Sequence, residues 1–318
     1  MDLKDYEYLP TSPVLDDVIS FLVAAPNIGL LTGFQKISAG RSVSIRNGDD
    51  DLARIVTFEN ASSTVWITIP KLSDIQKGTS PARNILILLL ILMAKQCLQH
   101  GTLYDTKVKF SLKDLVSYGF YSSTHTARAG FERAMDILQS IRVAWSTNKK
   151  KQMHSAVLFT TYHIENSKCT VTVNSELDWS FIVRFYTVLP SCYSRLPLKA
   201  SILLYTVMYL LRQNIHAVIT SQAFSIQLST VMIRLALPDP ADTKNPMRDI
   251  LEPINDAVKQ INSAVQDEDL RLEIIAPEGS KTTQILDMGK MVVHVGGTPL
   301  AYCNTIPQNA RSKKEATP

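Results

Sequence analysis

The sequence predicts an α+β fold in which one order of elements occurs twice, after a β-rich N-terminal extension. Two largely apolar helices, at 80–101 and 198–211, each precede a short strand, two further helices and a β-hairpin. Apolar residues recur at helical spacing in the helices and alternate in the strands. The repeated order indicates a diverged duplication.

Length and composition are those of a globular chain. The 318 residues are 45% hydrophobic and 19% charged, which predicts a packed core and room for two domains. The net charge of +4 is mild, so nucleic-acid binding would depend on local basic patches. The cysteines lie far apart, so we expect no disulfide framework and no structural zinc. No signal-peptide pattern is present, which favours the reducing cytoplasm.

Residues 1–78 are predicted to form a separate extension. Thr11 or Ser12 can cap a short helix that has Pro13 in its first turn. Asn47-Gly48 is a hairpin signal, because both residues tolerate positive φ. It lies in a predicted meander of three strands: Ser42–Arg46, Leu52–Glu59 and Thr64–Ile69.

The first repeated unit, 79–190, contains the segment that predicts a function. Its opening apolar helix is too short to span a membrane. A strand and short helix follow, Gly119 ends that helix, and Ser122–Thr124 can cap a second helix that ends near Ile141. Strands Arg142–Thr147 and Ala156–His163 are joined by a basic loop. Helix, turn, helix and basic-tipped hairpin form the layout of a winged-helix DNA-binding domain.

The helix before Ile141 has a face suited to a DNA groove. Its apolar positions share one side, which we expect to pack inward: Ala127, Phe131, Ala134, Met135, Leu138 and Ile141. Small residues beside an arginine on the other side, including Gly130, would allow close approach to base edges. We assign DNA binding here to Thr126, Arg128, Ala129, Arg133 and the loop residues Lys149, Lys150 and Lys151. An ordinary surface helix and a solvated loop tip are the alternatives.

The second unit, 191–305, repeats the order. A strand at Cys169–Val173 and a helix at Leu177–Val188 precede it. Its predicted elements are Leu198–Leu211, Ala223–Ile226, Gln227–Leu235, Pro246–Ala264, Leu270–Ile275 and Ile285–Val295, with a turn at Pro277–Lys281. Phe224-Ser225-Ile226 echoes Phe110-Ser111-Leu112. Residues 306–318 are predicted to be a disordered basic tail.

The long helix at Pro246–Ala264, capped by Asn245, is the second candidate reader of DNA. Its predicted inner positions are Met247, Ile250, Leu251, Ile254, Val258 and Ile261, and its outer positions are Asn245, Arg248, Glu252, Asp256 and Lys259. We assign DNA binding to Asn245, Arg248, Lys259 and the turn residue Lys281. The mixed charge of the outer face is also typical of a solvated helix.

Residues 80–300 resemble the tandem winged-helix replication initiators of iteron-type plasmids. The resemblance rests on the doubled order, on Phe110–Leu115, on Leu196–Leu211 and most closely on Arg248–Asn262. It implies binding to direct repeats at an origin of double-stranded DNA, opening of the adjacent duplex and recruitment of host helicase and polymerase factors. It also implies autorepression by a homodimer formed through the first winged helix, and no covalent chemistry.

Enzymes that act at replication origins carry sequence motifs that are absent from this sequence. It has neither a His-x-His metal pair nor a phosphate-binding GxxxxGK[ST] loop. Asp49-Asp50-Asp51 is read as a solvated turn. We therefore expect no enzyme activity, cofactor, metal or membrane contact. A winged-helix transcriptional regulator and a winged-helix protein-interaction module remain as alternatives.

Overall fold

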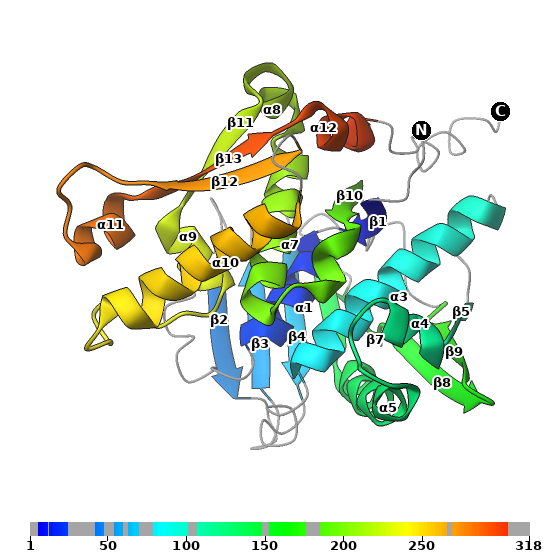
Figure 1. The fold of residues 1–318 in the computed structure, drawn as a ribbon. Coiled ribbons are helices and arrows are strands. Elements are labelled where there is room, and N and C mark those ends of the chain that lie inside the picture. Colours follow the sequence, from blue (N-terminus) through cyan, green and yellow to red (C-terminus); the bar gives the residue numbers. More distant parts are fainter. Residues whose placement is uncertain are drawn as a thin grey trace, which may run out of the picture.

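The computed structural model is a mixed α and β structure (Figure 1). It describes residues 6–11, 13–24, 42–47, 54–59, 63–69, 79–100, 107–147, 153–175, 185–265 and 269–304. Within these ranges, no single helix has the length and apolar character needed to cross a membrane. In the same ranges, one pair of consecutive helices, Leu198–Gln213 and Ile215–Ser221, is long and apolar enough when the two are taken together, but the pair is bent by 92°.

The N-terminal elements are β1 (Tyr6–Thr11), α1 (Pro13–Ala24), β2 (Ser42–Asn47), β3 (Arg54–Glu59) and β4 (Ser63–Ile69). The predicted helix and the antiparallel meander β2-β3-β4 are confirmed. The sequence does not predict β1, which pairs antiparallel with β10 (Phe185–Pro190). The helix predicted over Leu177–Val188 is wrong from Phe185 onward, because these residues bond to β1, with Phe185 opposite Thr11.

The first unit consists of α3 (Thr79–His100), β5 (Lys107–Ser111), α4 (Leu112–Ser117), α5 (Thr124–Ser140), β8 (Phe159–Glu165) and β9 (Lys168–Val173). Its strands form an antiparallel sheet in the order β5-β9-β8. Ser111 and Ser123 cap α4 and α5 through their hydroxyl groups. Every residue predicted on the inner face of α5 is buried, which confirms the orientation of that helix.

The hairpin predicted as the basic wing belongs to a different sheet. Strands β6 (Arg142–Thr147) and β7 (Met153–Val157) pair with each other, but β6 also pairs with β4 in a five-stranded sheet, β2-β3-β4-β6-β7. The chain changes sheets at Leu158, where the backbone and side chain of Asn174 donate to the Leu158 and Val157 carbonyls at 3.0 and 2.9 Å. The three-stranded sheet uses the β8–β9 hairpin instead. The predicted placement of the wing is therefore wrong, because the free edge of β4 takes up β6.

The second unit follows the short η3 (Ser191–Arg195). It consists of α7 (Leu198–Gln213), α8 (Ile215–Ser221), β11 (Ala223–Gln227), α9 (Leu228–Arg234), η4 (Met247–Leu251), α10 (Glu252–Ala264), β12 (Leu270–Ile275), α11 (Thr282–Met288), β13 (Lys290–Val295) and α12 (Gly297–Asn304). Its sheet has the order β11-β13-β12, so the first, third and second strands are neighbours in both units.

Three local predictions in the second unit are corrected. A helix, α11, occupies the start of the strand predicted at Ile285–Val295. The predicted long helix begins as a π-helical turn, η4, and becomes α-helical only around Pro253, which lies in the first turn of α10. Met247 was predicted to face inward but is 45% exposed, because the wider π turn rotates it out of register with the buried positions.

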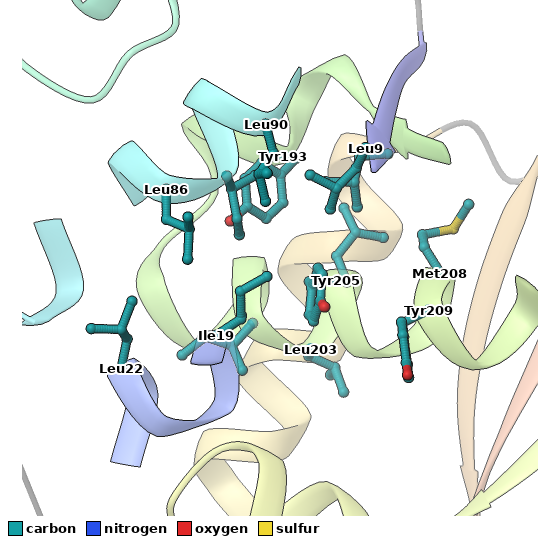
Figure 2. Close-up of a cluster of buried hydrophobic side chains, with 14 of the residues drawn as sticks. Leu9, Ile19, Leu22, Leu86, Leu90, Tyr193, Leu203, Tyr205, Met208 and Tyr209 are labelled. Atoms are coloured by element: carbon teal, nitrogen blue, oxygen red, sulfur yellow. The ribbon is translucent and has the colours of Figure 1, made fainter. Parts of the chain in front are cut away.

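The hydrophobic core is continuous across β1, α1 and both units. Helix α7 is buried along most of its length. In Figure 2 its residues Leu203, Tyr205 and Met208 lie among Leu9 of β1, Ile19 of α1 and side chains of α3. Figure 1 shows α7 at the centre of the molecule, with the sheet β11-β13-β12 on one side of it and α3 on the other. The predicted apolar helices are therefore core helices.

Candidate nucleic-acid interface

The outer face of α5 carries the residues predicted to contact DNA in the first unit. Thr126, Arg128, Ala129 and Arg133 are all exposed. Behind them, Phe131 meets Phe110 edge to face at 5.5 Å between ring centroids and Tyr162 at 5.7 Å. These buried ring contacts fix the rotation of α5 on its sheet, so the predicted outer face is presented to solvent.

Two of these four side chains already have partners within the helix. Thr126 forms the capping box with Ser123: its backbone N–H donates to the Ser123 hydroxyl at 3.2 Å, and its own hydroxyl donates to the Ser123 carbonyl at 2.9 Å. Arg128 Nε donates to Glu132 at 3.2 Å, in an exposed pair one turn apart. Such a pair contributes little to stability, so a phosphate can replace Glu132 at low cost.

Arg133 is the least committed cation on this face. No hydrogen bond or ion pair joins its side chain to another residue in the described part of the chain. It lies close enough to Tyr121 to act electrostatically on that phenol, whose pKa is raised by burial and partly lowered again by Arg133. Arg133 is therefore free to reach a phosphate or a base edge.

Gly130 has a structural role that the sequence analysis did not assign to it. A Cβ on Gly130 would lie 2.2 Å from the ring of Tyr121, so the absence of a side chain lets Tyr121 lie against α5. The prediction that Gly130 provides close approach to a groove is wrong, because the Tyr121 ring occupies that space. Ala129 and Arg133 remain on the exposed side.

In the second unit, Arg248 is fixed by its neighbours on η4. Its Nε donates to Asp249 at 2.9 Å, and the other carboxylate oxygen of Asp249 accepts from the Thr243 hydroxyl at 2.6 Å. The hydrogen bond from Arg248, then that from Thr243, holds the pKa of Asp249 below its ordinary value. The guanidinium stays largely exposed, at 70%. Arg248 is thus oriented in advance while its outer nitrogens face solvent.

Asn245 caps this helix as predicted. Its side-chain oxygen accepts from the backbone N–H of Arg248 at 3.2 Å, and its own N–H donates to the Thr243 hydroxyl at 3.3 Å. The cap oxygen is therefore committed, and only the amide NH₂ of Asn245 is available to DNA. Asn245 and Arg248 together form the N-terminal end of the candidate helix.

Lys259 and Lys281 are exposed but lie in different places. Lys281 directly precedes α11, which packs against η4, so it lies on the same side of the unit as Arg248. Lys259 lies in the second half of α10, and the exposed Glu252 and Asp256 lie between Arg248 and Lys259 in the helix. The charge pattern favours contact through the N-terminal end of the helix rather than along its length.

Lys149, Lys150 and Lys151 lie outside the described residues. Side-chain spacing alone does not reveal two exposed methionines, Met247 beside Arg248 and Met288 at the end of α11. A methionine in a helical apolar pattern reads as core, and only the π turn reveals Met247 as a surface residue.

No protein-family model and no curated protein matches the chain. Among solved structures, it is similar to the crystal structure of domains 2 and 3 of RctB, with a TM-score of 0.41 and 8% identity over 83% of this chain and 94% of that one. It is also similar to the selenomethionine derivative of the same two domains, with a TM-score of 0.37 and 8% identity over 86% and 99%. Both scores describe a loose likeness.

Proposed function

We propose that this chain is a sequence-specific double-stranded DNA-binding protein made of two tandem winged helices, and that it acts as a replication initiator. The observation that supports this most is the shared strand order of the two units, β5-β9-β8 and β11-β13-β12, each with a helix pair between its first two strands. In a winged helix, the second helix of that pair enters the major groove. Here those helices are α5, and η4 with α10.

The charges available on these helices suit a protein that reads a site rather than one that coats DNA. Arg133 is uncommitted, Arg248 is held by Asp249, and the intervening carboxylates would repel phosphates along most of α10. Binding would therefore depend on a few cations at defined positions. The arginine at the start of η4 can make a bidentate contact with a guanine edge.

The initiator role extends this binding to origin repeats, with opening of the adjacent duplex and recruitment of host replication factors. The domain limits 79–190 and 191–305, and a homodimer formed through the first unit, belong to the same proposal. A transcriptional regulator would bind duplex DNA with the same parts. The mixed charge of the α10 face favours the third candidate, a protein-interaction module.

Selection from a random pool of duplexes tests DNA binding first. We expect enrichment of one motif, with an affinity that falls steeply as salt rises. Recovery of no motif, with no salt-dependent binding, would leave the interaction module as the better account. For a recovered motif, plasmid maintenance with and without its direct repeats then separates an initiator from a regulator.

A further inference from the structure

Among the described residues two arginines are buried, Arg83 and Arg234, and one of them has a counter-ion there. Arg234 pairs with Asp16 at 2.9 Å. Arg83, in the first turns of α3, has no exposed surface and no carboxylate partner among the described residues. Its Nη1 donates to the neutral Asn84 Oδ1 at 3.0 Å and to the Ser201 hydroxyl at 3.4 Å, while Nε and Nη2 have no acceptor. An uncompensated buried cation is costly, so this site favours an anion nearby.

A cavity lies next to Arg83. Its volume is about 200 Å³, and it is formed where α3, the turn after α4, η3 and the start of α7 meet. Three residues that contact Arg83 line this cavity. Asn84 and Ser201 accept hydrogen bonds from Arg83, and the Arg83 guanidinium lies over the Tyr193 ring, 5.7 Å from its centroid. Arg83 therefore lies directly behind the polar part of the wall.

Arg83 also sets the orientation of Asn84. Because a guanidinium only donates, the Asn84 oxygen must face it, and the amide NH₂ is directed away from it. Asn84 is half-buried and lines the cavity, and its NH₂ has no hydrogen bond among the described residues. The Ser201 hydroxyl donates to the Leu198 carbonyl at 2.8 Å and is thus committed. The Asn84 NH₂ is thus a free donor at this wall, close to a buried positive charge.

The rest of the lining is apolar and aromatic. Phe120, Tyr121 and Leu196 also line the cavity. The cavity is partly open to solvent, and its volume of about 200 Å³ leaves room for a single ring with a small substituent. An inorganic ion would leave this apolar surface uncovered, whereas a ring would cover it.

We infer that this cavity binds a small organic anion, a carboxylate carried on a ring or a compact apolar group. The carboxylate accepts from the Asn84 NH₂ and is stabilised by the charge of Arg83, and the apolar part packs on Phe120, Tyr121 and Leu196. Arg83 acts as a positioning residue, because it does not touch the ligand. Residues of both units line the site. One of them, Tyr121, is also the residue whose ring lies against Gly130 of α5.

Benzoate is the probe, and thermal unfolding of the full chain is the measurement. Relative to sodium chloride at the same ionic strength, sodium benzoate should raise the unfolding midpoint by about 5 °C at a concentration about 100 times its Kd. Titration calorimetry should give one site per chain. Absence of any benzoate-specific rise, or an equal rise with phosphate, would overturn the assignment to an organic anion.

Asn84→Asp decides whether the effect arises in this cavity. The substitution keeps the shape, supplies Arg83 with a carboxylate and repels the ligand, so the benzoate shift should disappear. Arg271→Gln, which changes the net charge equally at an exposed position on β12, should keep it. A shift that persists in Asn84→Asp would overturn the proposal. These readouts do not involve DNA, so they stand or fall separately from the proposed function.

Discussion

Asp16 and Arg234, separated by 218 positions in the sequence, form a buried ion pair with Nη1 2.9 and 3.1 Å from the two carboxylate oxygens. Arg234 also donates to the Ser20 hydroxyl at 2.7 Å, and Tyr205 donates to Asp16 at 3.2 Å. The pair links α1 to α9 and α7. It ties the N-terminal elements to the second unit through hydrogen bonds that leave both charges compensated.

Removal of Asp16 should destabilise the protein strongly. Asp16→Ala leaves the Arg234 guanidinium buried without its counter-ion, which costs about 3–5 kcal/mol. Denaturant unfolding of the variant measures the loss. Glu132→Ala, which breaks the exposed pair with Arg128, is the matched control and should cost less than about 1 kcal/mol. Equal, small losses in the two variants would show that Arg234 needs no counter-ion.

Gly130→Ala should destabilise the first unit by overpacking. The added Cβ would meet the Tyr121 ring at 2.2 Å, so the ring or α5 must shift, at a cost of about 1–3 kcal/mol. Ala129→Gly, one residue away on the exposed face, lacks this contact and controls for helix propensity. A double-mutant cycle with Tyr121→Leu should recover part of the loss. No recovery would mean that Tyr121 does not restrict this position.

Arg133 and Arg248 should each contribute to reading DNA. Alanine at either should weaken binding to the selected site by about 1–3 kcal/mol if the contact is with a base edge, measured by anisotropy at fixed salt. Lys199→Ala, at an exposed position outside both helix faces, should bind normally. An equal loss on selected and random duplexes would make the residue a phosphate contact. An Arg248 variant without loss would leave the second unit without its reader.

Lys149, Lys150 and Lys151 lie in the sequence between β6 and β7. As phosphate contacts they should make the affinity for DNA fall more steeply as salt rises. Replacement of all three by alanine should weaken binding to selected and random duplexes alike and reduce the salt slope by about one unit per lost contact. Unchanged affinity and slope would identify the loop as solvated.

Features set by local periodicity could be predicted from the sequence. The buried face of α5 and the buried positions from Ile250 to Ile261 follow from side-chain spacing within one helix. The same holds for the cap at Ser123, whose hydroxyl accepts from the backbone N–H of Thr126, only three residues further along the chain. Once the buried positions of a helix are known, the remaining positions must be exposed, so the exposed candidate residues could be predicted too.

Features that depend on distant partners could not be predicted. Strand β6 alternates in the same way whether it pairs with β4 or with β9, and only the free edge of β4 decides. The sequence match between Phe110 and Phe224 does not correspond to equivalent positions in the two structures. Ser111 and Gln227 each directly precede the next helix, so Phe110 corresponds to the buried Ile226. A shift of two residues preserves the strand face, so the pattern could not detect it.

We expect the two units to read one duplex together at a fixed spacing. Pro190 ends β10, Pro197 directly precedes α7, and η3 fills the residues between them, so the joint has little freedom. Footprinting on a selected site whose halves are moved apart by five base pairs tests this directly, because the insertion places them on opposite faces of the duplex. We expect that the insertion abolishes protection of one half and lowers the affinity to that of a single half-site. Tight binding that survives the insertion would contradict it.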